Sequence, residues 1–143
     1  DLDWGYDFEG PLRLDGVVSY VRGKRRDIDD NLYRVSPPSA LAALTWEEAR
    51  WSASLEARGV ASQKEASFTN SEEETPGYML LNLYADWDVA EGIGLSAGVE
   101  NLLDKQYRDH LAGYNRNGFG DVHPGDRVPG AGRGVFLRLT LAQ

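Results

Sequence analysis

Seven segments of the chain alternate between apolar and polar residues, and this alternation restricts the possible folds more than any other feature. Successive side chains on a strand point to opposite faces, so a period of two predicts strands with one apolar and one polar face. The segments cover residues 1–8, 12–22, 39–47, 51–58, 81–87, 95–100 and 135–141. We therefore predict an all-β protein, an antiparallel up-and-down sheet of about seven strands.

The connections between these segments alternate in length. Short turns occupy residues 9–11, 47–50 and 88–92, and long loops occupy residues 23–38, 62–77 and 104–133. Successive turns of an up-and-down sheet lie at opposite ends, so all short turns fall at one end and all long loops at the other. This asymmetry is typical of bacterial outer-membrane barrels, whose periplasmic turns are short and whose extracellular loops are long.

Large aromatic residues border each short turn, on the apolar face of the strands: Phe8, Trp46, Trp51 and Trp87. Amphipathic rings collect at the boundary between membrane and water, because one side of the ring is apolar and one edge is polar. The sequence therefore predicts that one face of the sheet meets lipid and that the opposite face lines a polar lumen. We assign Leu55, Leu83, Val99 and Leu139 to the lipid face, and Glu56, Arg58, Asn82 and Arg138 to the lumen.

A soluble β-sandwich or small soluble barrel is the alternative, because alternation alone also suits a core-facing and a solvent-facing side. No run reaches the roughly 18 apolar residues of a membrane helix. The chain has no Cys, which excludes disulfides, thiolate metal sites and Cys nucleophiles. Its net charge of −8 argues against general nucleic-acid binding, because phosphates would repel it.

Two segments near the end of the chain carry a family resemblance. Residues 98–107 (Gly-Val-Glu-Asn-Leu-Leu-Asp-Lys-Gln-Tyr) resemble a hallmark segment near the C-terminus of TonB-dependent outer-membrane receptors. Residues 129–133 are similar to the Pro-x-Pro-Gly-Arg element that opens the final strand of that family, with Ala131 in place of the second Pro. Residues 32–37 and 75–78 also resemble segments of these receptors.

This resemblance implies a fold and a role. It implies that residues 1–143 are the C-terminal portion of a receptor β-barrel without the plug domain, in the outer membrane of a Gram-negative cell. The whole receptor would import a scarce ligand, such as a metal ion or a siderophore-like metal chelate, with energy from TonB acting through the plug. Expected partners are outer-membrane lipid, lipopolysaccharide and the rest of the receptor. We expect no cofactor and no enzymatic activity; a structural or adhesive surface barrel is the rival function.

The family usually ends on an aromatic residue, whereas this chain ends Leu141-Ala142-Gln143. Residues 107–111 and the segment around Tyr33 resemble the copper-receptor branch. If that likeness holds, His110, His123 and Met79 are the candidate ligand-binding residues, with the two His as metal ligands, because imidazole and thioether suit copper. The spacing of the two His matches no recognised zinc motif, so ordinary solvated loop histidines are the alternative.

Two charged stretches lie in the long loops. Lys24-Arg25-Arg26 is followed by Asp27, Asp29 and Asp30, and this charge-segregated loop could contact lipopolysaccharide phosphates or another loop, or remain a solvated loop tip. Glu72-Glu73-Glu74 is expected to form a solvated acidic tip. No phosphate loop, nucleophile elbow or catalytic triad is visible.

Overall fold

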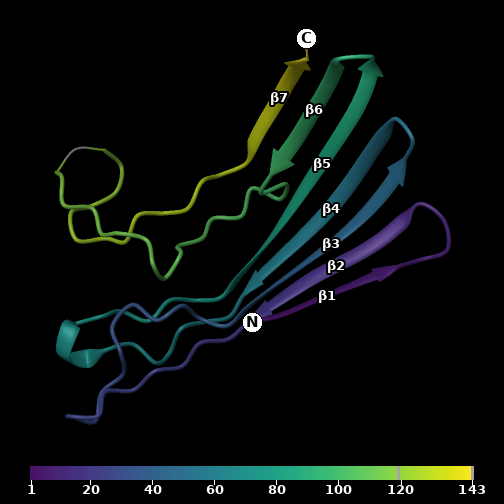
Figure 1. Ribbon diagram of the computed structural model, residues 1–143. Helices are drawn as coiled ribbons and strands as arrows, with labels where there is room; N and C mark the ends of the chain where they lie inside the picture. Colours follow the sequence, from purple (N-terminus) through teal and green to yellow (C-terminus); the bar gives the residue numbers. More distant parts are fainter. Residues whose placement is uncertain (119, 143) are drawn as a thin grey trace.

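A computed structural model, which describes residues 1–118 and 120–142, contains one antiparallel sheet in these described parts. The strands follow one another in chain order, each paired with the next (Figure 1). They are β1 (Leu2–Asp7), β2 (Leu12–Ser19), β3 (Ser39–Glu48), β4 (Trp51–Val60), β5 (Tyr78–Ala90), β6 (Ile93–Glu100) and β7 (Gly134–Leu141). The predicted seven-stranded, up-and-down, all-β architecture is confirmed. The bounds differ most in β5, which runs from Tyr78 to Ala90 rather than over 81–87 and so takes in part of the predicted turn 88–92, and in β2, which ends at Ser19 rather than at residue 22.

Short turns lie at one end of the sheet and long loops at the other, as predicted (Figure 1). Gly10 and Gly92 occupy the first and last short turns at φ of 102° and 71°, a region that side chains disfavour. The first, second and third long loops are residues 20–38, 61–77 and 101–133. A 3-10 helix, η1 (Phe68–Asn70), lies in the second long loop. No helix in the described parts of the chain is long and apolar enough to cross a membrane.

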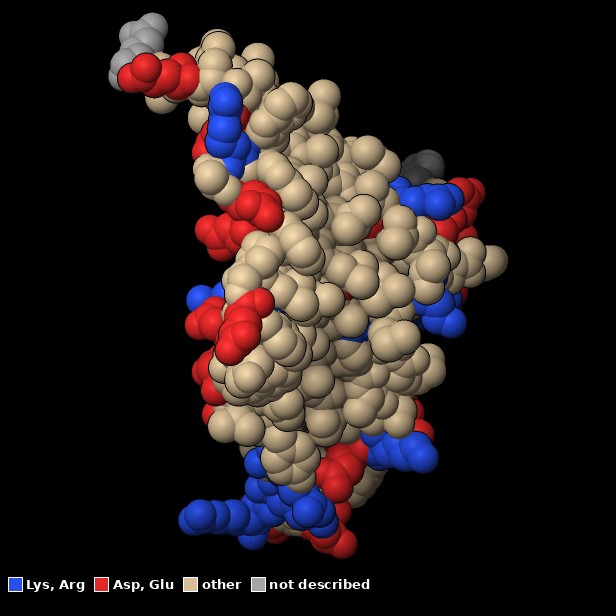
Figure 2. Space-filling model, turned by 90° about the vertical axis from the view of Figure 1, so that its right-hand side faces the viewer, with Lys and Arg blue, Asp and Glu red and all other residues tan. Residues whose placement is uncertain are grey.

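The register brings the predicted lipid-facing residues side by side. Leu55 of β4 pairs with Leu83 of β5, which pairs with Val99 of β6. Leu55 and Leu83 are 44% and 42% exposed, although strands flank them on both sides. Figure 2 shows a broad surface free of Lys, Arg, Asp and Glu across the middle of the molecule, with charged residues at its ends and margins. The arrangement is that of a wall with one apolar, outward-facing side.

The opposite face of the wall carries polar side chains that bond across strands. The Asn82 side-chain amide donates to Glu56 Oε1 at 2.7 Å, and the Ser96 hydroxyl donates to Asp86 Oδ1 at 2.6 Å. Gly98 of β6 lies beneath an aromatic ring, because a Cβ there would be 2.3 Å from the Phe136 side chain. The polar residues that we assigned to a lumen thus lie on the same face of the sheet as the aromatic rings of Tyr84 and Phe136.

Buried hydrophobic residues are few. In the described parts of the chain they are Val60, Tyr78 and Leu80, with Tyr107 packed against them. A soluble sandwich buries one whole face of each sheet. In the described parts of the chain no second layer of strands or helices covers the apolar face, so a sandwich formed within these residues does not match the arrangement. The edges of the sheet are β1 and β7.

Candidate functional site

The third long loop is fixed at its base by the residues that carried the family resemblance. Asn101 adopts a left-handed conformation at φ 48°, which Asn tolerates better than most residues. Its side-chain amide donates to the carbonyls of Lys105 at 2.9 Å and Ala131 at 3.1 Å, and its side-chain oxygen accepts the Lys105 N–H at 2.8 Å. Asp104 accepts the Arg133 N–H at 2.9 Å. The two ends of the loop are thereby tied together directly above the sheet.

Tyr107 completes this loop base. Its ring lies against Tyr78, with centroids 4.5 Å apart, and against Gly130, where a Cβ would be 2.1 Å from the ring. Any side chain at Gly130 would displace Tyr107. The two segments that carried the family resemblance, residues 101–107 and the residues around Gly130, thus contact each other. This contact accounts for Tyr107 and Gly130 without any ligand.

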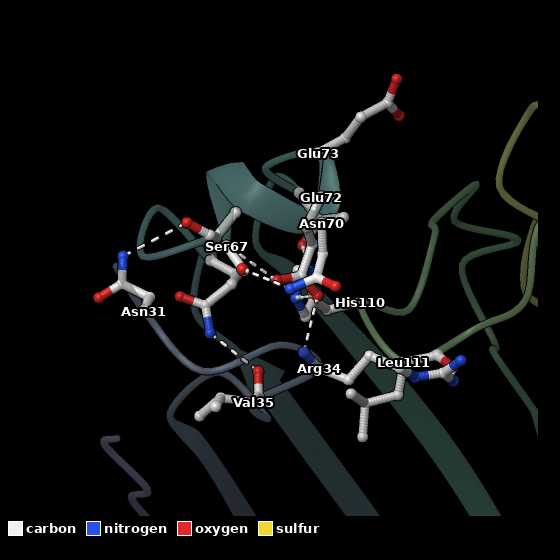
Figure 3. Close-up of polar contacts among 12 residues, drawn as sticks. Asn31, Arg34, Val35, Ser67, Asn70, Glu72, Glu73, His110 and Leu111 are labelled. Carbon is white, nitrogen blue, oxygen red and sulfur yellow. Dashed lines mark hydrogen bonds and ion pairs between the residues drawn. The ribbon is translucent and has the colours of Figure 1, made fainter. Parts of the chain in front are cut away.

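The outer parts of the three long loops meet in a cluster of polar groups, most of them buried (Figure 3). We call this the loop hub and define it as Asp30 and the backbone N–H of the exposed Arg34 from the first loop, Ser67, Glu72 and Thr75 from the second, and His110 and Arg127 from the third. Five of these residues, Asp30, Ser67, Thr75, His110 and Arg127, are at most 6% exposed. Buried polar groups are tolerated only when they are hydrogen-bonded, so the hub depends on complete pairing.

Asp30 joins the first loop to the second. Its carboxylate accepts the hydroxyls of Ser67 at 2.8 Å and Thr69 at 2.5 Å, and the backbone N–H of Phe68 at 3.0 Å. These bonds also satisfy donors at the start of η1. Burial raises the pKa of the Asp30 carboxyl, but the hydrogen bonds from Thr69 and Ser67 outweigh it and hold the pKa well below its ordinary value. Asp30 is therefore ionised at neutral pH.

Glu72 joins all three loops. Its Oε1 accepts the Arg34 N–H at 2.9 Å and faces His110 Nε2 at 3.1 Å, and its Oε2 accepts the Ser67 N–H at 2.9 Å. The Glu72 side chain is 2% exposed. The expectation of a solvated acidic tip is wrong for Glu72, because the backbone N–H groups of Arg34 and Ser67 donate to its carboxylate. Glu73 and Glu74 are exposed, as expected.

His110 is buried, with a bond at each ring nitrogen. Nδ1 lies 3.0 Å from Thr75 Oγ1, and Nε2 lies 3.1 Å from Glu72 Oε1. Because the Glu72 carboxylate can only accept, the network assigns the ring proton to Nε2 and makes Nδ1 the acceptor of the Thr75 hydroxyl. Burial lowers the pKa of the imidazole, and nearby Arg127 lowers it further, against the opposing effect of Glu72. His110 is not the solvated loop residue considered as an alternative.

Arg127 fixes the path of the third loop itself. Its guanidinium donates to the backbone carbonyls of His110, Ala112 and Glu73 and to the Tyr114 hydroxyl, and it lies 4.7 Å above the Tyr114 ring. A planar, always-charged guanidinium can serve several acceptors at once. Nothing in the sequence marked Arg127, because its partners are mostly backbone carbonyls.

The three predicted ligand-binding residues are not brought together. His110 lies inside the hub, whereas the His123 side chain is 88% exposed, with Nδ1 3.9 Å from Asp126. Met79 is 59% exposed on β5 and points to the face opposite Tyr78, whose hydroxyl contacts Asp109 next to His110. Within residues 1–118 and 120–142, no group of three or more His, Asp and Glu side chains is arranged to hold a metal ion.

Comparison with known proteins identifies relatives of this architecture. A family profile described as "TonB dependent receptor-like, beta-barrel" matches residues 1–102. Among solved structures, one named "Copper transporter OprC" superposes with a TM-score of 0.90 and 30% sequence identity, over 97% of this chain. The chain spans only 22% of the length of that protein. No curated protein matches the sequence.

Proposed function

The chain belongs to the TonB-dependent receptor family, and from this premise we propose that it is the C-terminal part of the β-barrel of an outer-membrane receptor that imports a metal ion or metal chelate. In this proposal residues 1–143 supply wall strands and the three long loops at the outer mouth. A plug domain and the remaining strands belong to the rest of the receptor, and TonB acts through that plug.

The observation that carries the proposal is the sheet itself. It has an exposed apolar face, short turns at one end and long loops at the other, and it matches a transporter barrel over nearly its whole length. Those properties suit a wall between lipid and a polar lumen. The receptor role is supported by the long loops, which in this proposal lie at the face that meets incoming ligand.

We propose copper as the cargo to test first, because the relative at 30% identity is named a copper transporter. His123 is the most accessible of the three candidate ligands in this chain. His110 would have to break its bonds to Thr75 and Glu72 before it could bind a metal. Met79 is the weakest of the three candidates, because it lies on the same face of β5 as Leu83, the face that in this proposal meets lipid. These assignments stay predictions, and the remainder of the receptor would supply further ligands.

Lipid and lipopolysaccharide remain the expected surroundings of the wall. Basic residues gather with acidic ones at the loop end of the surface in Figure 2. Arg25 is paired with Asp27, while Lys24 and Arg26 are exposed. We propose that these two cations face lipopolysaccharide phosphates at the tip of the first long loop. Their exposure supports this contact, since paired cations would have less charge to offer.

The test is uptake of copper ions by cells that produce the full-length receptor, with and without functional TonB. We expect saturable uptake that requires TonB and that falls in His123→Ala relative to the parent. Uptake that is the same without TonB would contradict import energised by TonB, and no uptake above receptor-free cells would contradict copper as the cargo. A receptor that accumulates in the outer membrane and binds a surface partner without transport would favour the structural or adhesive alternative.

A further inference from the structure

The Glu72 carboxylate is not needed to hold the strands of the sheet together. It bonds to the first loop through the Arg34 N–H, to its own loop through the Ser67 N–H and to the third loop through His110 (Figure 3). The base of the third loop is tied separately, by Asn101 and Asp104. The strand register and the loop base therefore have supports of their own, and Glu72 acts on the outer parts of the loops.

The burial of Glu72 couples the three loops to one another, in addition to the bonds that Asp30, Thr75 and Arg127 make between pairs of loops. A carboxylate that is 2% exposed is stable only while its hydrogen bonds are intact. If the third loop moved away, Glu72 would lose His110; if the first loop moved, it would lose the Arg34 N–H. Movement of either loop thus weakens the attachment of the other. The three loops are held as one body, rather than as three independent segments.

We propose that Glu72 is a positioning residue for ligand capture, which holds the three long loops together as one preformed surface at the mouth of the receptor. The inference rests on the proposed function, because it concerns how the outer loops meet the ligand. A preformed surface binds its ligand more tightly, because the entropy cost of ordering the loops is not subtracted from the free energy of binding. Loss of Glu72 should therefore raise the ligand concentration needed for half-maximal uptake and leave the maximal rate unchanged.

The experiment compares Glu72→Ala with Glu74→Ala in the full-length receptor, using copper ions as the probe. Glu74 is a matched control, because it is exposed on the same loop and the charge change is identical. We expect Glu72→Ala to raise the half-saturating copper concentration about tenfold at an unchanged maximal rate, the size of a coupling of about 1.4 kcal/mol. We expect Glu74→Ala to match the parent.

A second measurement follows loop position without any ligand. The chain has no Cys of its own, so spin labels can be placed on Cys substitutions at Phe68 in the second loop and Asn117 in the third, both of which are exposed. We expect one narrow distance distribution in the parent and in Glu74→Ala, and a broad one in Glu72→Ala. In Glu72→Gln the amide oxygen keeps two bonds, but its NH₂ group faces the Ser67 N–H, so an intermediate width is expected.

The two measurements separate failure of the inference from failure of the proposed function. A broadened distribution with unchanged half-saturation would show that Glu72 ties the loops without positioning a ligand, and would overturn the inference. So would an unchanged distribution in Glu72→Ala, even if the parent receptor proved to import no copper. If both Glu72 variants fail to accumulate as folded receptor, the carboxylate serves assembly, which also overturns it.

Discussion

In the sheet, apolar side chains lie exposed, whereas in the long loops charged and polar side chains lie buried. Leu55 and Leu83 in the middle of the sheet are more than 40% exposed, while Asp30 and Arg127 in the loops are 5% and 4% exposed. A soluble protein shows the reverse distribution. The difference indicates two sources of order. In the proposed receptor the sheet would be stabilised by lipid and by backbone pairing, and the loops by a closed set of hydrogen bonds. The two regions should therefore fail in different ways.

The largest effect should come from a charge on the apolar face. Leu83→Arg should destabilise the folded receptor by about 2–4 kcal/mol, because an Arg near the bilayer midplane faces lipid. Ser54→Arg is the matched change on the polar face, one strand away and opposite Tyr84; it should cost little. Urea unfolding of the full-length receptor in lipid vesicles measures both. Equal effects would contradict the assignment of the two faces.

Loss of Arg127 should affect the loops and spare the sheet. Arg127→Met should loosen the third loop by about 1.5–3 kcal/mol, because a buried charged donor is removed from several carbonyls and the Tyr114 hydroxyl. Hydrogen exchange by mass spectrometry should show faster exchange around residues 110–116, with β4 and β5 unchanged. Faster exchange throughout β4 and β5 would mean that the two regions are not independent.

Acid should produce the smallest effect, again confined to the loops. Burial lowers the pKa of His110 below its ordinary value of 6.5, so the open loops bind more protons than the closed hub between those two pKa values. The stability of the hub should therefore fall as the pH drops below about 6.5 and level off below the lowered pKa. Limited proteolysis of the third loop should accelerate between pH 7.5 and pH 5 in the parent. It should not accelerate in His110→Asn; the same acceleration there would assign the effect to another group.

The sheet could be predicted from the sequence because apolar and polar residues alternate along each strand, and because short turns and long loops alternate along the chain. The extension of β5 to Tyr78 was missed, since Tyr78, Met79 and Leu80 are apolar on both faces and show no alternation. Tyr78 and Leu80 are buried, while Met79 is exposed, and the residue that packs against the buried pair is Tyr107, which lies about 30 residues away in sequence.

The hub was not predictable in the same way. In the sequence, Glu72 is equivalent to Glu73 and Glu74. It differs from them in the structure because backbone N–H groups from two separate loops donate to its carboxylate. His110 was selected as a candidate metal ligand from the copper-receptor likeness of residues 107–111 and from its residue type, neither of which indicates burial. Whether a loop side chain is solvated or hydrogen-bonded depends on how loops distant in sequence pack together. No local sequence pattern indicates that packing.

The closed base of the third long loop has a consequence for how this region can change. Asn101 bonds to Ala131 across the neck of the loop, so the chain enters and leaves the sheet at fixed points whatever lies between them. Doubling the length of a flexible loop costs only about 0.6 kcal/mol of closure entropy. Residues inserted near Asn117, beyond the contacts of His110 and Arg127, should therefore leave β6 and β7 in register. The tip of this loop is a place where evolution, or an engineer grafting a foreign peptide for surface display, can alter the exterior of the receptor without rebuilding its wall.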